Sequence, residues 1–453
     1  MIIKFIVPAS DIRRNFLYRA GGSTYGHTNS ITGPLILGSI LKTAGHEVEV
    51  YEELYKNLDF RAFYDADVIG ISTMSSSSKR AYELADMFRN KIGKRVIIGG
   101  IHASALPEEA LKHADQVIVG EGEMVITDVV EGNITEKIVY SAYIENLDEI
   151  PIPDYTLLKT PCKAANIMTT RGCPYSCSFC STTRMFFPYR ERSVDSIIKE
   201  MEIYKKSGFK YMNFEDDNFT ANKERSKELL RKMISNKLIF KESFFFGRTD
   251  MARDDELLQL LSDAHLRRVL IGIESLNQES LDSINKNQDI KDIELCGEKL
   301  SKYKIKLIAS LVLGLDPDSK EDIRKSVEFA KSINAYQLQP AILTPFPGTP
   351  IYEQYVKENR MIVQDWSYYD MTNVTFIPNK MSPWELQEEF IHSLKHFYTF
   401  KSAFKILTLF GFNSWIRRLG LWLIGIGAEI FIRSEAEKEN GNIYNTLKKR
   451  DSS

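Results

Sequence analysis

The sequence lacks the paired cysteines that stabilise small secreted domains. It has five cysteines among 453 residues, and three of them lie within eight residues while the other two are solitary. Such usage is typical of a reducing compartment, so a cytoplasmic location is predicted. A signal peptide is also missing, because MIIKFIVPASDIRR is one short apolar strand without a small-residue cleavage site. We expect the chain to begin at Met1.

An excess of charge of either sign is absent as well. The formal net charge is −2, so no overall electrostatic feature favours nucleic acid, and no nucleic-acid partner is predicted. Apolar residues make up 43% of the chain and charged residues 26%, which excludes general disorder and is normal for a globular protein. The length provides for two or three domains.

Uninterrupted hydrophobic runs are short. The most apolar segment, residues 403–433, contains Arg417 and Arg418, and its uncharged stretches fall short of the ~20 residues that a membrane-spanning helix needs. Two interpretations remain open. The segment could form an interfacial amphipathic helix with Trp415 and Trp422 at the lipid boundary, which predicts peripheral membrane association. It could equally form a helix that covers the preceding domain.

The first 130 residues alternate β-rich runs with helical patterns. The expected strands are IIKFIVP, HEVEVYE, ADVIGIST, RVIIGG and DQVIVG. This alternation is typical of an α/β fold with a parallel sheet between helices, so a doubly wound, Rossmann-like domain is predicted over residues 1–130. Residues 131–164, which include IPIPDY, are predicted to be a linker.

The same alternation returns over residues 165–355. The expected strands are ANIMTT, YMNFED, SFFFGRT, RVLIGIE, KLIASLVLGL and YQLQPAIL. Six strand–helix units predict a (β/α)6 partial TIM barrel. Residues 356–453 are aromatic and helical in character and end in a polar tail from Arg433 onward, which we expect to be mobile.

The three clustered cysteines follow the first of these strands, in TTRGCPYSCSFCS. Cys173, Cys177 and Cys180 offer soft thiolate ligands on a loop that can fold around one small object. A structural zinc ion takes four protein ligands, and no fourth ligand is close in the sequence. An iron–sulfur cubane suits three thiolates better, because its fourth iron then stays open to a substrate.

The Cys-x3-Cys-x2-Cys spacing, with Phe179 before the last cysteine, resembles that of the radical S-adenosylmethionine (SAM) superfamily. The resemblance implies that Cys173, Cys177 and Cys180 hold a [4Fe-4S] cluster and that SAM binds its open iron. It further implies reductive cleavage of SAM to a radical that abstracts hydrogen from an unactivated carbon, with a one-electron reductant such as flavodoxin or ferredoxin as partner. The protein itself would bind and orient the cofactors and the substrate, and it would exclude water from the site.

Further positions match the superfamily at the carboxyl ends of the barrel strands, where barrel enzymes build their sites. The implied SAM-binding residues are Phe179, Glu215, Asp216, Arg248, Glu274, Ser275, Gly314 and Leu315. The acidic pair after the second strand would contact the ammonium group of SAM, and the arginine its carboxylate. The glutamate and serine after the fourth strand would contact ribose or ammonium, and the glycine and leucine would lie against adenine. A surface ion pair is the alternative for Arg248.

The N-terminal domain resembles the cobalamin-binding domain of one radical SAM subgroup, which includes the anaerobic magnesium-protoporphyrin monomethyl ester cyclase and cobalamin-dependent methyltransferases. The implied cobalamin-binding residues are Ser72, Thr73, Ser75, Gly99, Gly100, His102, Gly120 and Glu121. The Asp-x-His-x-x-Gly segment that supplies a cobalt ligand in some cobalamin proteins is missing, since His102 has no aspartate at the required offset. Cobalamin is therefore expected without a protein imidazole on cobalt.

The resemblance implies methyl transfer to an inert carbon of a small molecule. Oxidative cyclisation or rearrangement of a tetrapyrrole- or lipid-like substrate is an alternative within the subgroup. A non-catalytic metal-binding module is the alternative from another class, but it would not require charged residues at successive strand ends. The hypothesis of a lipid-like substrate is motivated by the apolar segment near the C-terminus.

Overall fold

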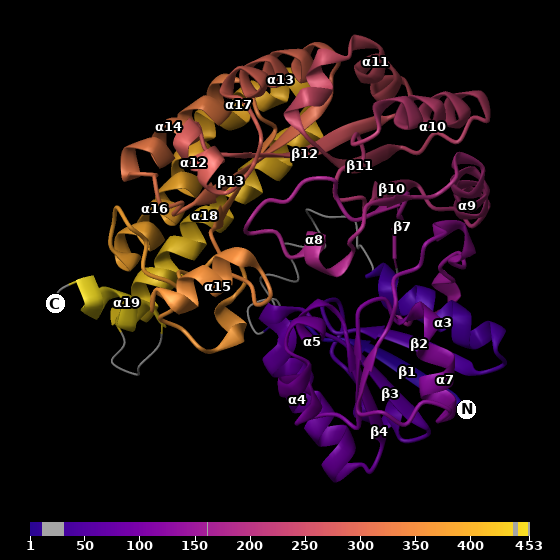
Figure 1. Ribbon diagram of the computed structural model, residues 1–453. Coiled ribbons are helices and arrows are strands. Elements are labelled where there is room, and N and C mark those ends of the chain that lie inside the picture. The colour runs from indigo at the N-terminus through magenta and orange to yellow at the C-terminus, as the bar shows by residue number, and fades with distance from the viewer. Residues whose placement is uncertain (11–30, 161, 438–442, 452–453) are drawn as a thin grey trace.

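The computed structural model describes residues 1–10, 31–160, 162–437 and 443–451. Two parallel sheets, each flanked by helices, lie one above the other in Figure 1, the N-terminal sheet below and the second sheet above. The short helix α8 (Thr182–Met185) lies in the space between them. The α/β class and the order of the two sheets agree with the prediction from sequence.

The first sheet confirms every strand expected in the N-terminal region. Its strands are β1 (Ile2–Val7), β2 (Glu47–Glu52), β3 (Val68–Ser72), β4 (Arg95–Gly99), β5 (Gln116–Val119) and β6 (Ile138–Tyr140). They are parallel and lie in the order β2-β1-β3-β4-β5-β6. Strand β6 comes from the segment expected to be a linker, so the first sheet extends beyond residue 130.

Both faces of this sheet are buried, as a doubly wound fold requires. On one face α3 (Thr32–Thr43) and α7 (Ile126–Glu131) pack through Leu35 and Val129 against the sheet. The other face is covered by α4 (Ser78–Asp86), α5 (Ile101–Ala105) and α6 (Pro107–Leu111). The strands are apolar on both sides because neither face meets solvent.

The second sheet is the predicted partial barrel. Its strands are β7 (Ala164–Ile167), β10 (Tyr211–Phe214), β11 (Glu242–Gly247), β12 (Leu266–Glu274), β13 (Lys306–Leu313) and β14 (Gln337–Ile342). They are parallel and follow the chain order, so the barrel stays open between β7 and β14. A two-stranded hairpin of β8 (Thr170–Arg171) and β9 (Arg190–Glu191) lies after β7.

The barrel helices are α9 (Val194–Lys206), α10 (Lys223–Ser235), α11 (Asp255–Asp263), α12 (Gln278–Ser283), α13 (Ile290–Lys302), α14 (Lys320–Ser332) and α15 (Pro350–Lys357). The longer ones begin after a polar residue whose side chain accepts a hydrogen bond from a backbone amide of the first turn. These N-cap residues are Ser193, Asn222, Asp254, Asp289 and Ser319. Such caps satisfy amides that the helix itself leaves unpaired.

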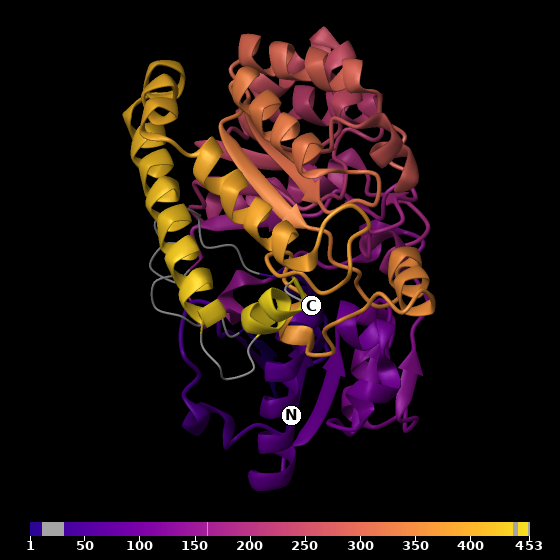
Figure 2. The same cartoon turned by 90° about the vertical axis from the view of Figure 1, so that its left-hand side faces the viewer.

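Four helices complete the chain: α16 (Pro383–Phe397), α17 (Phe400–Phe410), α18 (Phe412–Glu437) and α19 (Ile443–Asp451). Helix α16 packs on α14 and β14, and α18 runs along the outside of the barrel (Figure 2). Leu421 and Trp422 of α18 pack against the barrel core, which agrees with a covering helix. None of the helices among the described residues has the length and apolar character needed to cross a membrane.

The expectation of a mobile tail from Arg433 onward is wrong for the described residues there. Helix α18 continues to Glu437, and α19 buries Ile443, Tyr444 and Leu447. The hydroxyl of Tyr444 donates a hydrogen bond to Asn373 Oδ1 at 2.7 Å. A polar composition concealed this short apolar face, because its residues recur with helical spacing among lysines and asparagines.

Candidate active site

The cysteine loop lies at the carboxyl end of β7 and is anchored from two neighbouring elements. The Ser178 amide donates to the Ile284 carbonyl at 3.0 Å, and the Ser178 carbonyl accepts from the Ile351 amide at 3.3 Å. Gly172 opens the loop with φ +79°, and a Cβ there would lie 2.3 Å from the Phe186 carbonyl oxygen. Only glycine fits at this position.

The thiols of Cys173, Cys177 and Cys180 are free and half-buried. Burial raises the pKa of Cys173 to about 11 and also raises the pKa of Cys177, although Lys286 and Arg248 act in the opposite direction on Cys177. Without a metal these two thiols are therefore protonated, and metal binding would release their protons. Within the described ranges, no three histidine, cysteine or carboxylate groups converge enough to share one ion. A cubane needs no such convergence, because each thiolate binds a different iron.

Three charged residues act on Cys177: Arg248 and Glu274 at neighbouring strand ends, and Lys286 in the loop after α12. Arg248, after β11, lies over the ring of Tyr175 at 3.7 Å and donates to the Lys286 and Asn287 carbonyls at 2.6 and 3.0 Å. Lys286 Nζ lies 2.5 Å from Glu274 Oε1, at the end of β12. All three are less than a tenth exposed. Arg248 is therefore not a surface ion pair, and the cluster loop faces a buried group with two positive charges and one negative charge.

Glu215 and Asp217 follow β10 and face a cavity. Glu215 accepts a hydrogen bond from Asn166 Nδ2 at 2.6 Å and another from Thr32 Oγ1, which belongs to the N-terminal domain. Burial is the main cause that raises the pKa of each carboxyl to about 7, and the charge of Asp216 adds to it. Both groups are therefore poised to lose a proton when a cation approaches.

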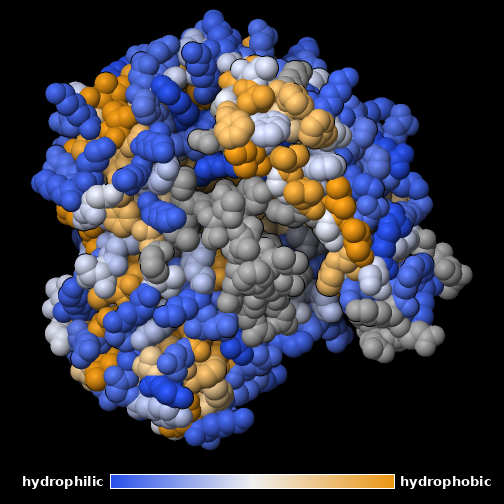
Figure 3. Space-filling model, turned by 180° about the vertical axis from the view of Figure 1, so that it is seen from behind, coloured by the Kyte–Doolittle hydropathy of each residue, from blue (hydrophilic) through white to orange (hydrophobic). Residues whose placement is uncertain are grey.

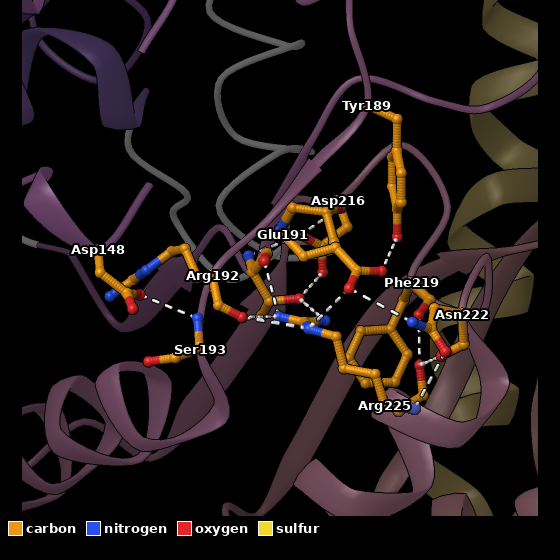
Figure 4. A network of polar contacts seen from close by, with 12 residues as sticks. Asp148, Tyr189, Glu191, Arg192, Ser193, Asp216, Phe219, Asn222 and Arg225 are labelled. Carbon is orange, nitrogen blue, oxygen red and sulfur yellow. Dashed lines mark hydrogen bonds and ion pairs between the residues drawn. The ribbon is translucent and has the colours of Figure 1, made fainter. Parts of the chain in front are cut away.

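Asp216, between them, has a different position from the one expected. It is fully buried and accepts hydrogen bonds from the amides of Thr169 and Thr170, at 2.6 and 2.5 Å. Arg225 donates to the Thr169 carbonyl at 2.8 Å in the same network, which Figure 4 shows beside β9. Asp216 therefore braces the backbone that leads into the cysteine loop, because its acceptor sites are taken by that segment.

Two more of the predicted SAM positions make contacts within the protein. Ser275 Oγ donates to Asp318 Oδ1 at 3.0 Å in a buried site. A Cβ on Gly314 would lie 2.5 Å from Leu386 of α16, so the close approach at this glycine is to the C-terminal helix. Leu315 is buried in the barrel core, and Phe179 packs against that core while partly exposed. Contacts of these four residues with SAM stay predictions.

The main cavity lies between the two domains and has a volume of about 510 Å³. Its N-terminal wall consists of the segments that follow β3, β4 and β5, which are Ser72–Met74, Gly99–Ile101 and Gly120–Glu123. The barrel wall includes Thr170–Gly172, Glu215 and Asp217. Both sheets therefore turn their carboxyl ends toward one space, which is where α/β folds bind ligands.

Glu121 joins the two domains rather than standing free in the cavity wall. It is 3% exposed, and its Oε2 accepts from Arg171 Nη1 at 3.0 Å and from Arg190 Nη1 at 3.1 Å. The Ile144 amide donates to the same oxygen at 3.0 Å, and Glu123 pairs with Arg171. The arginines hold the pKa of Glu121 below its usual value against the effect of burial. Since Arg171 lies two residues before Cys173, this ion pair connects the first domain to the cysteine loop.

His102 and Ser75 lie away from the cavity, in contrast to the expectation that they contact cobalamin. His102 is 1% exposed, with Nδ1 3.1 Å from Ser75 Oγ and Nε2 3.4 Å from Glu109 Oε1. Its ring meets the edge of Trp366, whose Nε1 donates to Glu109. Both ring nitrogens therefore have protein partners, and the absence of a histidine for cobalt in the sequence agrees with this geometry.

The remaining predicted cobalamin positions do line the cavity. They are Ser72, Thr73, Gly99, Gly100 and Gly120. Thr73 Oγ1 donates a hydrogen bond to the Gly99 carbonyl at 2.9 Å, and this bond stabilises the turn. Gly100 has φ +98°, and a Cβ there would lie 2.6 Å from the Thr73 carbonyl oxygen.

Sequence reasoning missed four residues that the structure brings to the site: Thr32, Arg171, Arg190 and Lys286. Lys286 lies in a loop and Arg190 in the two-residue strand β9, and neither position can be read from periodicity. Arg171 stands directly before the cysteine motif, and this adjacency was the one available signal. Thr32 begins α3, in a domain expected to serve the other cofactor.

Comparisons with known proteins agree with both halves of the site. The family model described as the radical SAM superfamily matches residues 167–330, and the model described as the B12 binding domain matches residues 20–130. The chain is therefore a radical SAM enzyme with an N-terminal B12-binding domain.

Relatives of known name match most of the chain. The chain is 28% identical over 379 residues to bacteriochlorophyllide d C-8(2)-methyltransferase of Chlorobaculum tepidum, covering 79% of this chain and 83% of the relative. It is 26% identical over 343 residues to the anaerobic magnesium-protoporphyrin IX monomethyl ester cyclase of Cereibacter sphaeroides, covering 68% of this chain and 56% of the relative. The fold is similar to that of the radical SAM methyltransferase TsrM of Kitasatospora setae, with a TM-score of 0.71 at 15% identity and coverage of 94% and 99%.

The two domains imply a [4Fe-4S] cluster, SAM and cobalamin as cofactors. The residues present fit these groups. Three half-buried thiols on an anchored loop form a donor set for a cluster with one open iron, and uncompensated carboxyls at Glu215 and Asp217 suit the cationic part of SAM. For cobalamin, the turns at Gly99, Gly100 and Gly120 present bare backbone to the cavity, which permits close approach of a large ligand.

Proposed function

We propose that this enzyme transfers a methyl group to an unactivated carbon of a small molecule, with Cys173, Cys177 and Cys180 as the cluster ligands. The observation that carries the proposal is the shared cavity, whose walls come from the cysteine-loop side of the barrel and from the turns of the B12-binding domain. A ligand held on one wall faces a ligand held on the other. When bound, the cluster and SAM supply radical chemistry and cobalamin supplies a methyl carrier.

The barrel wall would bind and orient SAM through charge. Glu215 and Asp217 offer carboxyls to its ammonium or sulfonium group, and the approach of that cation would lower their pKa values and release protons. Arg248 and Lys286 offer positive charge beside the cysteine loop, where the carboxylate of SAM would be neutralised. The half-buried setting of the loop excludes most water from this region.

The N-terminal wall would bind cobalamin through shape. Its glycines at 99, 100 and 120 present bare backbone to the cavity, and Ser72 adds a hydroxyl. This wall permits close approach of a large flat ligand, since no side chain projects at these glycines. His102 takes no part in cobalt binding in this arrangement.

The first test is metal content after anaerobic reconstitution with iron, sulfide and hydroxocobalamin. We expect about four irons and one cobalt per chain in the wild type, as one cubane and one corrin require. The C173A/C177A/C180A variant should lose the iron and keep the cobalt. Cys296 is buried in α13 and distant in sequence, so the C296A variant is the matched control and should keep both. Zinc in place of iron would contradict the cluster assignment.

Product analysis then tests the reaction. With SAM, a strong one-electron reductant such as flavodoxin or ferredoxin, and a tetrapyrrole or lipid extract, methyl transfer predicts both S-adenosylhomocysteine and 5′-deoxyadenosine in equal amounts. 5′-Deoxyadenosine alone would instead support oxidative cyclisation or rearrangement. The tetrapyrrole hypothesis is supported by relatives whose names specify bacteriochlorophyllide and protoporphyrin substrates.

A cytoplasmic location with peripheral membrane contact is a further part of the proposal. Helices α17 and α18 expose large apolar side chains, among them Phe404, Phe412 and Phe431, each at least half exposed. Figure 3 shows apolar surface running diagonally across the face that these helices occupy. An apolar helix face of this kind binds at a lipid interface and would give access to a lipid-like substrate.

Co-sedimentation with liposomes tests this contact. We expect the wild type to sediment with vesicles and the F404S/F412S/F431S variant to stay in the supernatant. Exposed apolar residues elsewhere provide the control, and Y64S/M124S should sediment like the wild type. Absence of sedimentation of the wild type would remove the membrane contact and leave the enzymatic proposal intact.

A further inference from the structure

A second cavity lies at the amino ends of the barrel strands, beside the first turns of α18. Its volume is about 50 Å³, and three arginines line it, Arg268, Arg417 and Arg418. Arg268 stands near the amino end of β12, and Gln337, which also lines the cavity, begins β14. The cysteine loop and the main cavity lie at the carboxyl ends of the strands. The arginine pocket, defined by these three arginines, is therefore separate from the catalytic site.

Positive charge exceeds negative charge around this pocket. Arg268 Nη1 lies 3.7 Å from Glu242 Oε1, but the other oxygen of Glu242 already lies 2.6 Å from Lys306 Nζ. One carboxylate thus serves two cations. Burial and the neighbouring charge of Arg417 lower the pKa of Arg268, and burial lowers the pKa of Arg418 to about 10. Buried cations of this kind are costly unless an anion pairs with them.

The guanidinium groups are held in place but not fully satisfied. Arg418 is 4% exposed and donates from Nη1 to the Ala335 and Tyr336 carbonyls at 3.0 and 2.7 Å, and it stacks on Phe397 at 4.2 Å. Arg268 stacks on Phe244 at 5.3 Å. The Nε atoms of Arg268 and Arg418 are both buried without a hydrogen-bond partner among the residues that the structure describes. Such orphaned donors indicate a missing acceptor.

We propose that the arginine pocket binds a phosphate-type oxyanion. The guanidinium fork matches the oxygens of phosphate in geometry and charge. The volume exceeds the roughly 10–15 Å³ that a single water needs, which leaves room for a small oxyanion. The anion could be free phosphate or the headgroup of a phospholipid, since the exposed side chains of Phe412 and Ile416 lie on the same turns of α18 as Arg417.

Inorganic phosphate is the first probe, with the full chain reconstituted with its cluster and saturated with cobalamin so that the main cavity is filled. Thermal unfolding in 20 mM phosphate is compared with unfolding in chloride at the same ionic strength. An anion that binds only the folded state with a millimolar Kd raises the Tm of a chain of this length by about 2 °C. The 31P line of phosphate should also broaden in the presence of protein.

Variants separate an anion site from merely structural arginines. We expect R268Q to lose the phosphate response and to unfold at an equal or higher temperature than the wild type in chloride, because it removes one of the crowded cations. R417Q should reduce the response at least tenfold in affinity. R433Q changes an exposed arginine of the same helix and should respond like the wild type. A Tm that falls in R268Q equally in both salts, or a wild type indifferent to phosphate, would overturn the proposal.

Vesicles distinguish the two sources of phosphate. Binding to phosphatidylglycerol vesicles that R417Q weakens and free phosphate inhibits indicates a lipid headgroup. A phosphate response without such competition indicates a free anion. Both results support the site, and neither depends on the identity of the methylated substrate.

Discussion

The two walls of the main cavity differ in the types of residue that form them. Among the described residues, the N-terminal wall presents mainly glycines and apolar side chains, while His102 lies outside the cavity and is paired with Ser75 and Glu109. The barrel wall presents buried charges, with Glu215 and Asp217 in the cavity and Arg248 beside the cysteine loop. A large neutral ligand can be held by shape, whereas a small zwitterion is held by charge. The contrast supports the proposal that one wall binds cobalamin and the other SAM.

The largest effect is expected where the two walls are joined. Glu121→Ala leaves Arg171 and Arg190 buried without their carboxylate, and breaking a buried pair in this way costs about 3–5 kcal/mol. Chemical denaturation measures this loss, and the iron content should fall with it. Asp292→Ala, which breaks the exposed pair with Arg253, is the control and should cost less than about 1 kcal/mol. Equal losses of unfolding free energy in the two variants would contradict a special role of Glu121 in joining the domains.

The shape-based wall can be tested at Gly100. Gly100→Ala places a Cβ 2.6 Å from the Thr73 carbonyl oxygen at a positive φ, so we expect a cost of about 2–4 kcal/mol and a loss of bound cobalt. Gly93 has a similar φ of +74°, and a Cβ there meets nothing within 4 Å. Gly93→Ala therefore measures the cost of a side chain at positive φ without a steric clash. Cobalt should be retained in that variant. Retention of cobalt in Gly100→Ala as well would contradict the role of this wall.

The charge-based wall predicts a pH dependence. The folded-state pKa of Glu215, about 7, is above its ordinary value of 4.5, so the folded chain binds the extra proton between these values. This contribution to stability is full below pH 4.5 and is lost as the pH rises through 7. The loss is about 1–3 kcal/mol, because the carboxyl is partly exposed to the cavity. Glu215→Gln should remove the contribution of Glu215 to this fall in urea denaturation of the cofactor-free protein. Binding of SAM should release fewer protons in this variant than in the wild type, because Asp217 still titrates in both proteins. Parallel pH profiles for the two proteins would refute the assignment.

The smallest effect on cofactor binding is expected at His102. His102→Gln should change the affinity for cobalamin by less than about twofold, while the loss of its buried contacts costs about 1–2 kcal/mol of stability. Absorption titration with hydroxocobalamin measures the first and thermal unfolding the second. A marked shift of the cobalamin spectrum in this variant would show that the imidazole reaches cobalt after all.

The strands and the cysteine motif could be predicted from sequence because each is a local pattern. All eleven expected strands lie where the periodicity places them, since buried parallel strands are continuous apolar runs. The orientations of Asp216, Ser275 and His102 could not be predicted, because each depends on partners 27 to 47 residues away. The same holds for the arginine pocket, whose members come from β12 and α18. Neighbouring carboxylates such as Glu215 and Asp216 look alike in sequence and differ only in which way the strand end turns them.

The ion pair between Glu121 and Arg171 limits how far the barrel can be treated as an independent module. The side chains of Arg171, two residues before Cys173, and of Arg190 in β9 are neutralised by a carboxylate from another domain, so a barrel expressed alone would leave both guanidinium groups without that partner. Excision of the N-terminal domain therefore removes more than a cofactor site. We therefore expect a barrel expressed alone to assemble its cluster less completely than the full chain does.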